Sequence, residues 1–94
     1  MIRVVARTLV REENIDAYHA LAKELVEKTQ KERGNVSYTL NQSVEDPRMH
    51  AMIEVWESRD ALEAHLASEH FLRIVPQMGQ LAQEKYPLEM YTEV

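Results

Sequence analysis

Hydrophobic and polar residues alternate with a period of two in several stretches of the chain. Residues 2–11 are rich in β-branched side chains and arginine, and their apolar groups fall on both faces. This pattern is typical of a strand whose two faces are both covered. Residues 36–44 and 49–56 alternate in the same way, and residues 45–48 between them have turn chemistry, because a proline presets one φ angle. We therefore predict that residues 36–56 form a hairpin.

After the first strand, apolar side chains return at helical spacing. They form one stripe from Ile15 to Thr29. Asn14 precedes the stripe as a candidate N-cap, and Gly34 follows it as a candidate C-terminal glycine. The spacing predicts one amphipathic helix here.

A second helix is predicted to begin after Ser58, whose hydroxyl can cap it. Apolar positions continue at helical spacing as far as Leu81, but Pro76 and Gly79 favour a bend or a break. After this helix the chain becomes extended again, and residues 88–94 fit a last strand.

The resulting element order is β-α-β-β-α-β, which is the split βαβ arrangement called ferredoxin-like. It predicts an α+β fold with an antiparallel sheet, formed by residues 1–94 as a single domain. Two helices can cover only one face of a four-stranded sheet. Because residues 2–11 place apolar groups on both faces, we expect the same face of a second subunit to cover the other, which makes the protein a homodimer.

Composition and charge exclude several classes of function. The chain has no cysteine, which removes disulfides, thiolate metal sites and thiol nucleophiles. Its net charge is −5 and its basic residues are scattered, whereas nucleic-acid binding needs a concentrated basic face. No apolar stretch approaches the roughly 20 residues of a bilayer span, and the N-terminus lacks the apolar run of a signal peptide. A cytoplasmic protein that contacts neither membrane nor nucleic acid is expected.

An acidic residue interrupts the apolar pattern of the third strand. Alternation places His50, Met52, Glu54 and Trp56 on one face, so that a carboxylate stands between a methionine and the only tryptophan. Burying it without a partner would cost several kcal/mol. Two interpretations remain open: Glu54 serves a pocket, or it forms an ion pair across the sheet with one of Arg3, Arg7 and Arg11.

Histidines are the other candidates for proton transfer. His65 and His70 are five residues apart, which turns them about 140° from each other on a continuous helix, so we expect no shared metal. Either one could still exchange a proton near neutral pH if it faces a cavity. His19 and His50 are expected to face solvent. Nucleotide-binding glycine motifs are absent, and no other cluster has metal-site spacing.

The stretch that carries these candidates resembles a known family. Residues 54–71 read EVWESRDALEAHLASEHF, with an E-x-W strand end, a capped helix containing A-L-x-x-H, and then S-x-H-F. This is similar to the hallmark of the antibiotic biosynthesis monooxygenase family. Residues 34–38 also resemble that family's glycine turn into its second strand, and the similarity extends in order and spacing over nearly the whole chain.

The resemblance implies a dimeric α/β barrel in which two ferredoxin-like sheets face each other. Several members oxidise quinols or polycyclic phenols with O2 and use no metal, flavin or haem. A pocket base removes a phenolic proton, and the resulting anion reduces O2 directly. This chemistry asks for an apolar cavity and one or two proton-transfer groups. By resemblance, the catalytic candidates are Glu54, His65 and then His70, and the substrate-binding candidates are Tyr38, Met52, Trp56 and Arg7.

Other branches of the family define the alternatives. Haem-degrading members have an asparagine where this chain has Arg7 and a haem-ligating histidine where it has Val75, so haem is not expected. Members that isomerise a phosphorylated carbonyl signal molecule need cationic groups, which Arg3 or Arg7 could supply. A third alternative is a dimeric small-molecule-binding module without catalysis, in which Glu54 is tied to an arginine.

Overall fold

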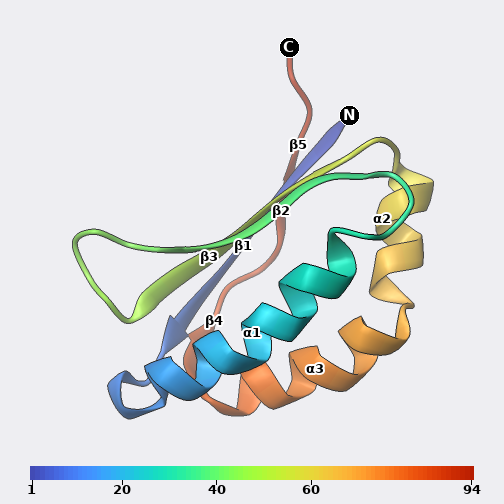
Figure 1. Ribbon diagram of the computed structural model, residues 1–94. Helices are drawn as coiled ribbons and strands as arrows, with labels where there is room; N and C mark the ends of the chain where they lie inside the picture. The colour runs from blue at the N-terminus through green and yellow to red at the C-terminus, as the bar shows by residue number, and fades with distance from the viewer.

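The computed structural model covers residues 1–94 and arranges them in two layers, a sheet and a set of helices packed against one of its faces (Figure 1). The predicted α+β ferredoxin-like fold is confirmed. The elements are β1 (Ile2–Val10), a 3-10 turn η1 (Glu12–Asn14), α1 (Ile15–Thr29), β2 (Asn35–Gln42), β3 (Met49–Trp56), α2 (Arg59–Leu66), α3 (Glu69–Gln80), β4 (Ala82–Lys85) and β5 (Glu89–Tyr91).

The strands lie in the order β2-β3-β1-β4, and every neighbouring pair is antiparallel. The predicted last strand, residues 88–94, is only partly correct. Two short strands share that edge: β4 pairs with β1 at its C-terminal end, and β5 pairs with β1 at its N-terminal end. Pro87 separates them because it has no N–H for the ladder. Since Tyr91 already lies opposite Arg3 near the start of β1, the last three residues have no strand left to pair with.

The second predicted helix is broken, but not where proline and glycine suggested. It ends at Leu66, and α3 begins at Glu69. The Ser68 hydroxyl makes the break, because it accepts the Phe71 N–H at 3.3 Å and donates to the His65 carbonyl at 2.7 Å. The helix continues through Pro76 because that residue lies on the solvent side, where water can satisfy the freed carbonyl.

The core lies between the helices and the inner face of the sheet. Its largest fully buried side chains include Trp56, Leu25 and Ile74. None of the helices has the length and apolar character needed to cross a membrane.

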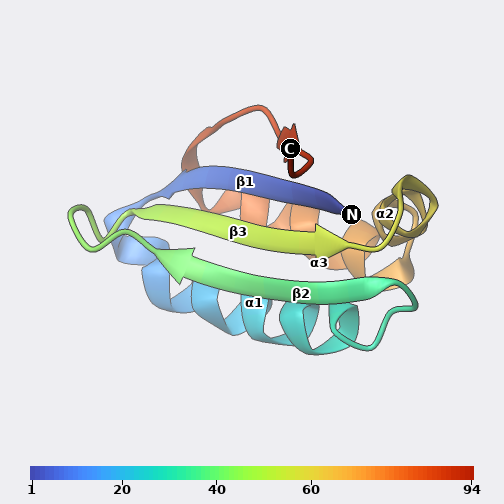
Figure 2. The same ribbon diagram turned by 90° about the horizontal axis from the view of Figure 1, so that it is seen from above.

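The opposite face of the sheet carries no helix (Figure 2). Val5 and Ile53 lie directly opposite each other on adjacent strands of this face, and Ile53 is 43 % exposed. Leu9 and Val55 are half-buried on the same face. This apolar surface is the one that the sequence assigns to a second subunit.

Candidate functional site

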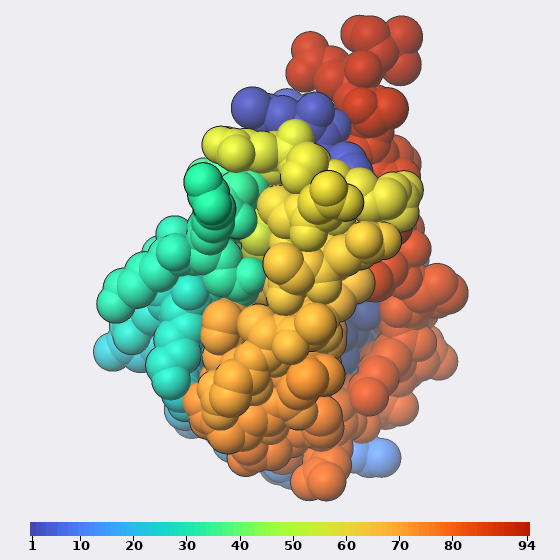
Figure 3. All heavy atoms as spheres, turned by 90° about the vertical axis from the view of Figure 1, so that its right-hand side faces the viewer, coloured from blue at the N-terminus to red at the C-terminus, as the bar shows by residue number.

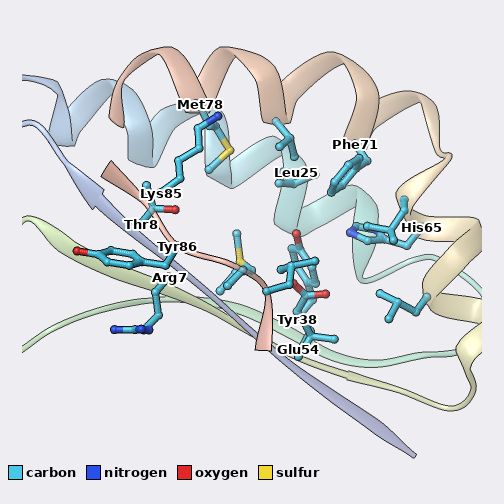
Figure 4. Close-up of a pocket in the computed structure, with 18 of the residues that line it drawn as sticks. Arg7, Thr8, Leu25, Tyr38, Glu54, His65, Phe71, Met78, Lys85 and Tyr86 are labelled. Carbon is cyan, nitrogen blue, oxygen red and sulfur yellow. The ribbon is translucent and has the colours of Figure 1, made fainter. Parts of the chain in front are cut away.

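A cavity of about 250 Å³ lies between the sheet and the helices. Its walls are formed by β1, α1, β2, β3, α2, α3 and the segment around β4, and most of the lining side chains are apolar. Figure 3 shows a hollow between the α2–α3 region and the C-terminal segment, with β1 at its floor. Most of the lining is apolar or aromatic, and its charged or titratable side chains include those of Glu54, His65, Lys85 and Arg7 (Figure 4).

Glu54 is built into the inner face of the sheet. Strand pairing places it between Tyr38 of β2 and Val4 of β1, and it is only 5 % exposed. Its Oε1 accepts a hydrogen bond from Trp56 Nε1 at 2.9 Å. Burial raises the pKa of Glu54 to about 7, and the Trp56 hydrogen bond offsets part of that effect. A carboxyl group with this pKa can exchange a proton near neutral pH.

The alternative in which Glu54 pairs with an arginine is wrong. Because Val4 lies opposite Glu54, the neighbouring Arg3 and Arg7 point to the other face of the sheet. Arg3 pairs with Glu93 at 3.4 Å and Arg7 with Glu89 at 3.1 Å. Glu54 therefore meets an N–H donor and the cavity instead of a cation.

His65 and His70 come together, contrary to the expectation for a continuous helix. The break at Ser68 turns both side chains toward Glu32, whose Oε2 lies 2.7 Å from His65 Nδ1 and 2.6 Å from His70 Nε2. His65 is also packed among aromatic rings, with ring centroids 4.7 Å from Trp56 and 5.0 Å from Phe71. Burial lowers the pKa of His65, and the adjacent Glu32 opposes that shift.

Glu32 is the residue of this cluster that the sequence analysis missed. It stands in a charged run between α1 and β2, which is typical of a solvated turn. Because its partners lie 33 and 38 positions away, no spacing within the run marks it. Only the tertiary contact identifies it.

The cluster of Glu32, His65 and His70 also has the donor types of a metal site, and its donor atoms lie within 4.8 Å of one another. The two N···O distances, however, have hydrogen-bond length. Ligands of a tetrahedral zinc ion with bonds of about 2.0–2.1 Å would lie roughly 3.3 Å apart. As it stands, the geometry is that of two imidazoles donating to one carboxylate oxygen.

The remaining predicted site residues divide between the cavity and its surroundings. Tyr38 and Met52 line the cavity, and Arg7 lines it with its stem while its guanidinium lies over the Tyr86 ring, 4.7 Å from the centroid (Figure 4). Trp56 is fully buried behind Glu54 and His65 instead of forming the wall. His70 likewise lies outside the cavity. Residues of the lining that sequence reasoning did not single out include Leu25, Met78, Lys85 and Tyr86.

The expectation that His19 and His50 face solvent is wrong for His50, which is 1 % exposed, and His19 is half-buried. His50 lies on the helix-covered face of β3, where its Nδ1 donates to the Arg48 carbonyl at 3.0 Å. Its Nε2 then accepts from His19 Nε2 at 2.8 Å. Burial lowers the pKa of His50. The pair lies outside the cavity and ties α1 to the sheet.

Comparisons with known proteins agree on one family. A sequence model described as antibiotic biosynthesis monooxygenase matches residues 1–77. Rv0793 of Mycobacterium tuberculosis is 32% identical over 80 residues, which are 85% of this chain and 78% of that protein. The crystal structure of a conserved protein from Methanosarcina mazei Go1 has a TM-score of 0.96 at 32% identity, covering 99% of this chain and 92% of the other. Another crystal structure, described as an antibiotic biosynthesis monooxygenase, has a TM-score of 0.95 at 35% identity and covers 100% of this chain and 99% of the other.

Proposed function

This chain belongs to the antibiotic biosynthesis monooxygenase family, and on that premise we propose that its cavity binds a quinol or a related electron-rich aromatic and oxidises it with O2. The observation that carries this proposal is the buried carboxyl of Glu54. It faces an apolar cavity, and its pKa of about 7 suits removal of a phenolic proton near neutral pH.

The proposed reaction begins with transfer of a phenolic proton to Glu54. The anion left in the cavity is a much stronger electron donor than the neutral quinol, and it reduces O2 directly. One oxygen atom enters the ring, the other leaves as water, and a hydroxyquinone is the product. The quinol supplies all four electrons, so the reaction needs no external reductant and, in this proposal, no resident cofactor.

The walls of the cavity favour a flat apolar substrate. Tyr38, Phe71 and Met52 offer contact surface to a ring, and Trp56 supports Glu54 and His65 from behind. His65 offers a second proton-transfer group at the same wall. With most of the lining apolar, water is disfavoured, which strengthens the electrostatic effect of each polar group.

We expect the purified protein to accelerate O2 uptake in the presence of a hydroquinone or naphthoquinol, with one O2 consumed per quinol. An oxygen electrode measures the uptake, and mass spectrometry of the product checks that one oxygen atom from labelled O2 has been incorporated. Because Glu54 must be ionised to act as a base, the rate should rise as the pH passes about 7. Uptake at the uncatalysed rate across a broad quinol panel would contradict the proposal.

A second candidate function is isomerisation of a phosphorylated carbonyl compound. It is favoured by Lys85, which lines the cavity and forms no salt bridge with any carboxylate. Such an ammonium group could bind a phosphate. Phosphorylated carbonyl compounds therefore form a second arm of the ligand panel, and thermal stabilisation by them but not by quinols would favour the isomerase.

The proposed working form is a homodimer held together by the open face of the sheet, with Val5 and Ile53 at its centre. Ile53→Asp places a charge on this apolar surface and is expected to convert the protein to a monomer, because an unpaired buried charge costs several kcal/mol. Light scattering coupled to gel filtration measures the mass. Leu72→Asp, at an exposed apolar position of α3, is the matched control and should remain dimeric. A monomeric wild-type protein would contradict the proposal.

A further inference from the structure

The carboxylate of Glu32 is held between two imidazoles at the outer side of the cavity wall. One oxygen, Oε2, contacts both His65 Nδ1 and His70 Nε2. An ionised carboxylate only accepts hydrogen bonds, so each of these nitrogens carries a hydrogen. The His65 side chain is 1 % exposed, whereas those of Glu32 and His70 are each 14 % exposed. Glu32 thus contacts the cavity only through His65.

This contact determines which nitrogen of His65 can accept a proton. In a neutral imidazole one ring nitrogen is a donor and the other an acceptor. Hydrogen on Nδ1 therefore leaves a lone pair on Nε2. No protein group hydrogen-bonds Nε2, and the ring lines the cavity (Figure 4). Burial lowers the pKa of His65, which favours the neutral ring.

Packing alone cannot determine which ring nitrogen of His65 faces the cavity. The aromatic rings of Trp56, Tyr38 and Phe71 surround His65 with centroids 4.7, 5.2 and 5.0 Å away, and they fix the plane of the imidazole. Rotating the ring by 180° about its Cβ–Cγ bond exchanges nitrogen with carbon positions and hardly changes its shape. Only a directional polar contact can distinguish the two orientations, and Glu32 supplies it.

We propose that Glu32 is a positioning residue that fixes both the ring orientation and the tautomer of His65, so that an unprotonated Nε2 is presented to the cavity as a proton acceptor. His70 donates a second hydrogen bond to the same carboxylate oxygen. The tautomer part of this inference stands by itself, whereas its effect on turnover rests on the proposed quinol oxidation.

The direct test is the protonation pattern of His65, read from two-bond ¹H–¹⁵N correlations of labelled protein at pH 8. In the wild type we expect hydrogen on Nδ1 and none on Nε2. In Glu32→Leu the hydrogen should move to Nε2, which is the tautomer that an unconstrained imidazole prefers. Glu32→Gln keeps a carbonyl acceptor and should preserve the wild-type pattern. The tautomer can still be measured in this variant if the leucine variant does not fold.

His70→Ala is the matched control for a purely structural role. It removes one hydrogen bond from the same Glu32 oxygen but leaves the His65 contact in place. The tautomer of His65 should therefore remain that of the wild type. Three results would overturn the inference: hydrogen on Nε2 in the wild type, an unchanged tautomer in Glu32→Leu, or stoichiometric zinc in the purified protein with Nδ1 lacking hydrogen.

Turnover provides the second readout. With a quinol substrate, Glu32→Leu should lower kcat by about a hundredfold and change KM little, because Glu32 acts through His65 on proton transfer and does not contact the substrate. Glu32→Gln should recover most of that loss, and Lys31→Leu in the same loop should match the wild type. If the wild type shows no turnover, the proposed quinol oxidation is contradicted, but the inference about the His65 tautomer is not. Normal turnover in Glu32→Leu would instead end the positioning role.

Discussion

Replacing Glu54 with glutamine is expected to lower kcat by about 10²- to 10⁴-fold and, at the same time, to stabilise the protein above pH 7. The activity is lost because the amide cannot take a proton from the substrate. Stability rises because the amide removes a buried charge while its carbonyl can still accept from Trp56 Nε1. An opposite effect on activity and stability is typical of a residue retained for function.

The gain in stability follows from the raised pKa. Folded Glu54 keeps its proton up to about pH 7, whereas the unfolded chain releases it near the ordinary glutamate pKa of 4.5. Between these values the folded state binds more protons, so the free energy of unfolding of the wild type falls as the pH rises. The pKa shift corresponds to about 3 kcal/mol in the free energy of unfolding. The wild type loses this contribution as the pH rises above 7, whereas the glutamine variant, which has no proton to release, keeps it.

Urea denaturation of both proteins at pH 4, 5, 6, 7 and 8 measures this difference, which should be small at pH 4, below the unfolded pKa, and largest at pH 8. Glu57→Gln, at an exposed carboxylate three residues away, is the control and should show no such trend. A glutamine variant that is less stable than the wild type at pH 8 would mean that Glu54 has a favourable charged partner, contrary to the geometry.

Replacing Gly34 with alanine is expected to destabilise the fold by about 3 kcal/mol. Gly34 has a φ of +84°, where a side chain is strained, and an added Cβ would lie 2.5 Å from Ala61 Cβ in α2. The Gly34 carbonyl also accepts the Glu57 N–H at 2.8 Å, which holds the loop against the start of α2. Because Glu32 lies in the same loop, the change should also loosen its contact with His65.

Gly79→Ala makes a matched control with the opposite expectation. The added Cβ would meet only the end of the Lys85 side chain, which can move, and alanine is favoured over glycine within α3 by up to about 1 kcal/mol. Thermal denaturation should therefore show a clear loss for Gly34→Ala and none for Gly79→Ala. Equal effects of the two changes would contradict the assigned role of the loop.

The local pattern of apolar and polar residues was sufficient to predict most elements of the fold. Period-two alternation located β1 and the β2–β3 hairpin, and helical spacing located α1, because these periods follow from backbone geometry. The same alternation put Glu54 and Trp56 on one face of β3, and the structure has them hydrogen-bonded there. The split of the last strand was missed, since it depends on where β1 begins.

The candidate site could be predicted only in part from the same pattern. Glu54 could be selected because a carboxylate within an apolar strand face is conspicuous. The surroundings of Glu54 could not be predicted from the sequence, because the absence of an arginine partner depends on the register between β1 and β3. His65 and His70 seemed to diverge because a continuous helix was assumed, and one serine hydroxyl at the α2–α3 junction reverses that conclusion.

By itself, then, the sequence determined the order of the elements, the inner face that carries Glu54 and the similarity to a family, because each is written in short-range periodicity or in a contiguous motif. Only the tertiary structure decided that Glu32 joins His65 and His70 and that Trp56 stands behind the cavity. These contacts depend on how α2, α3 and the α1–β2 loop pack together, and packing joins residues that no spacing along the chain relates.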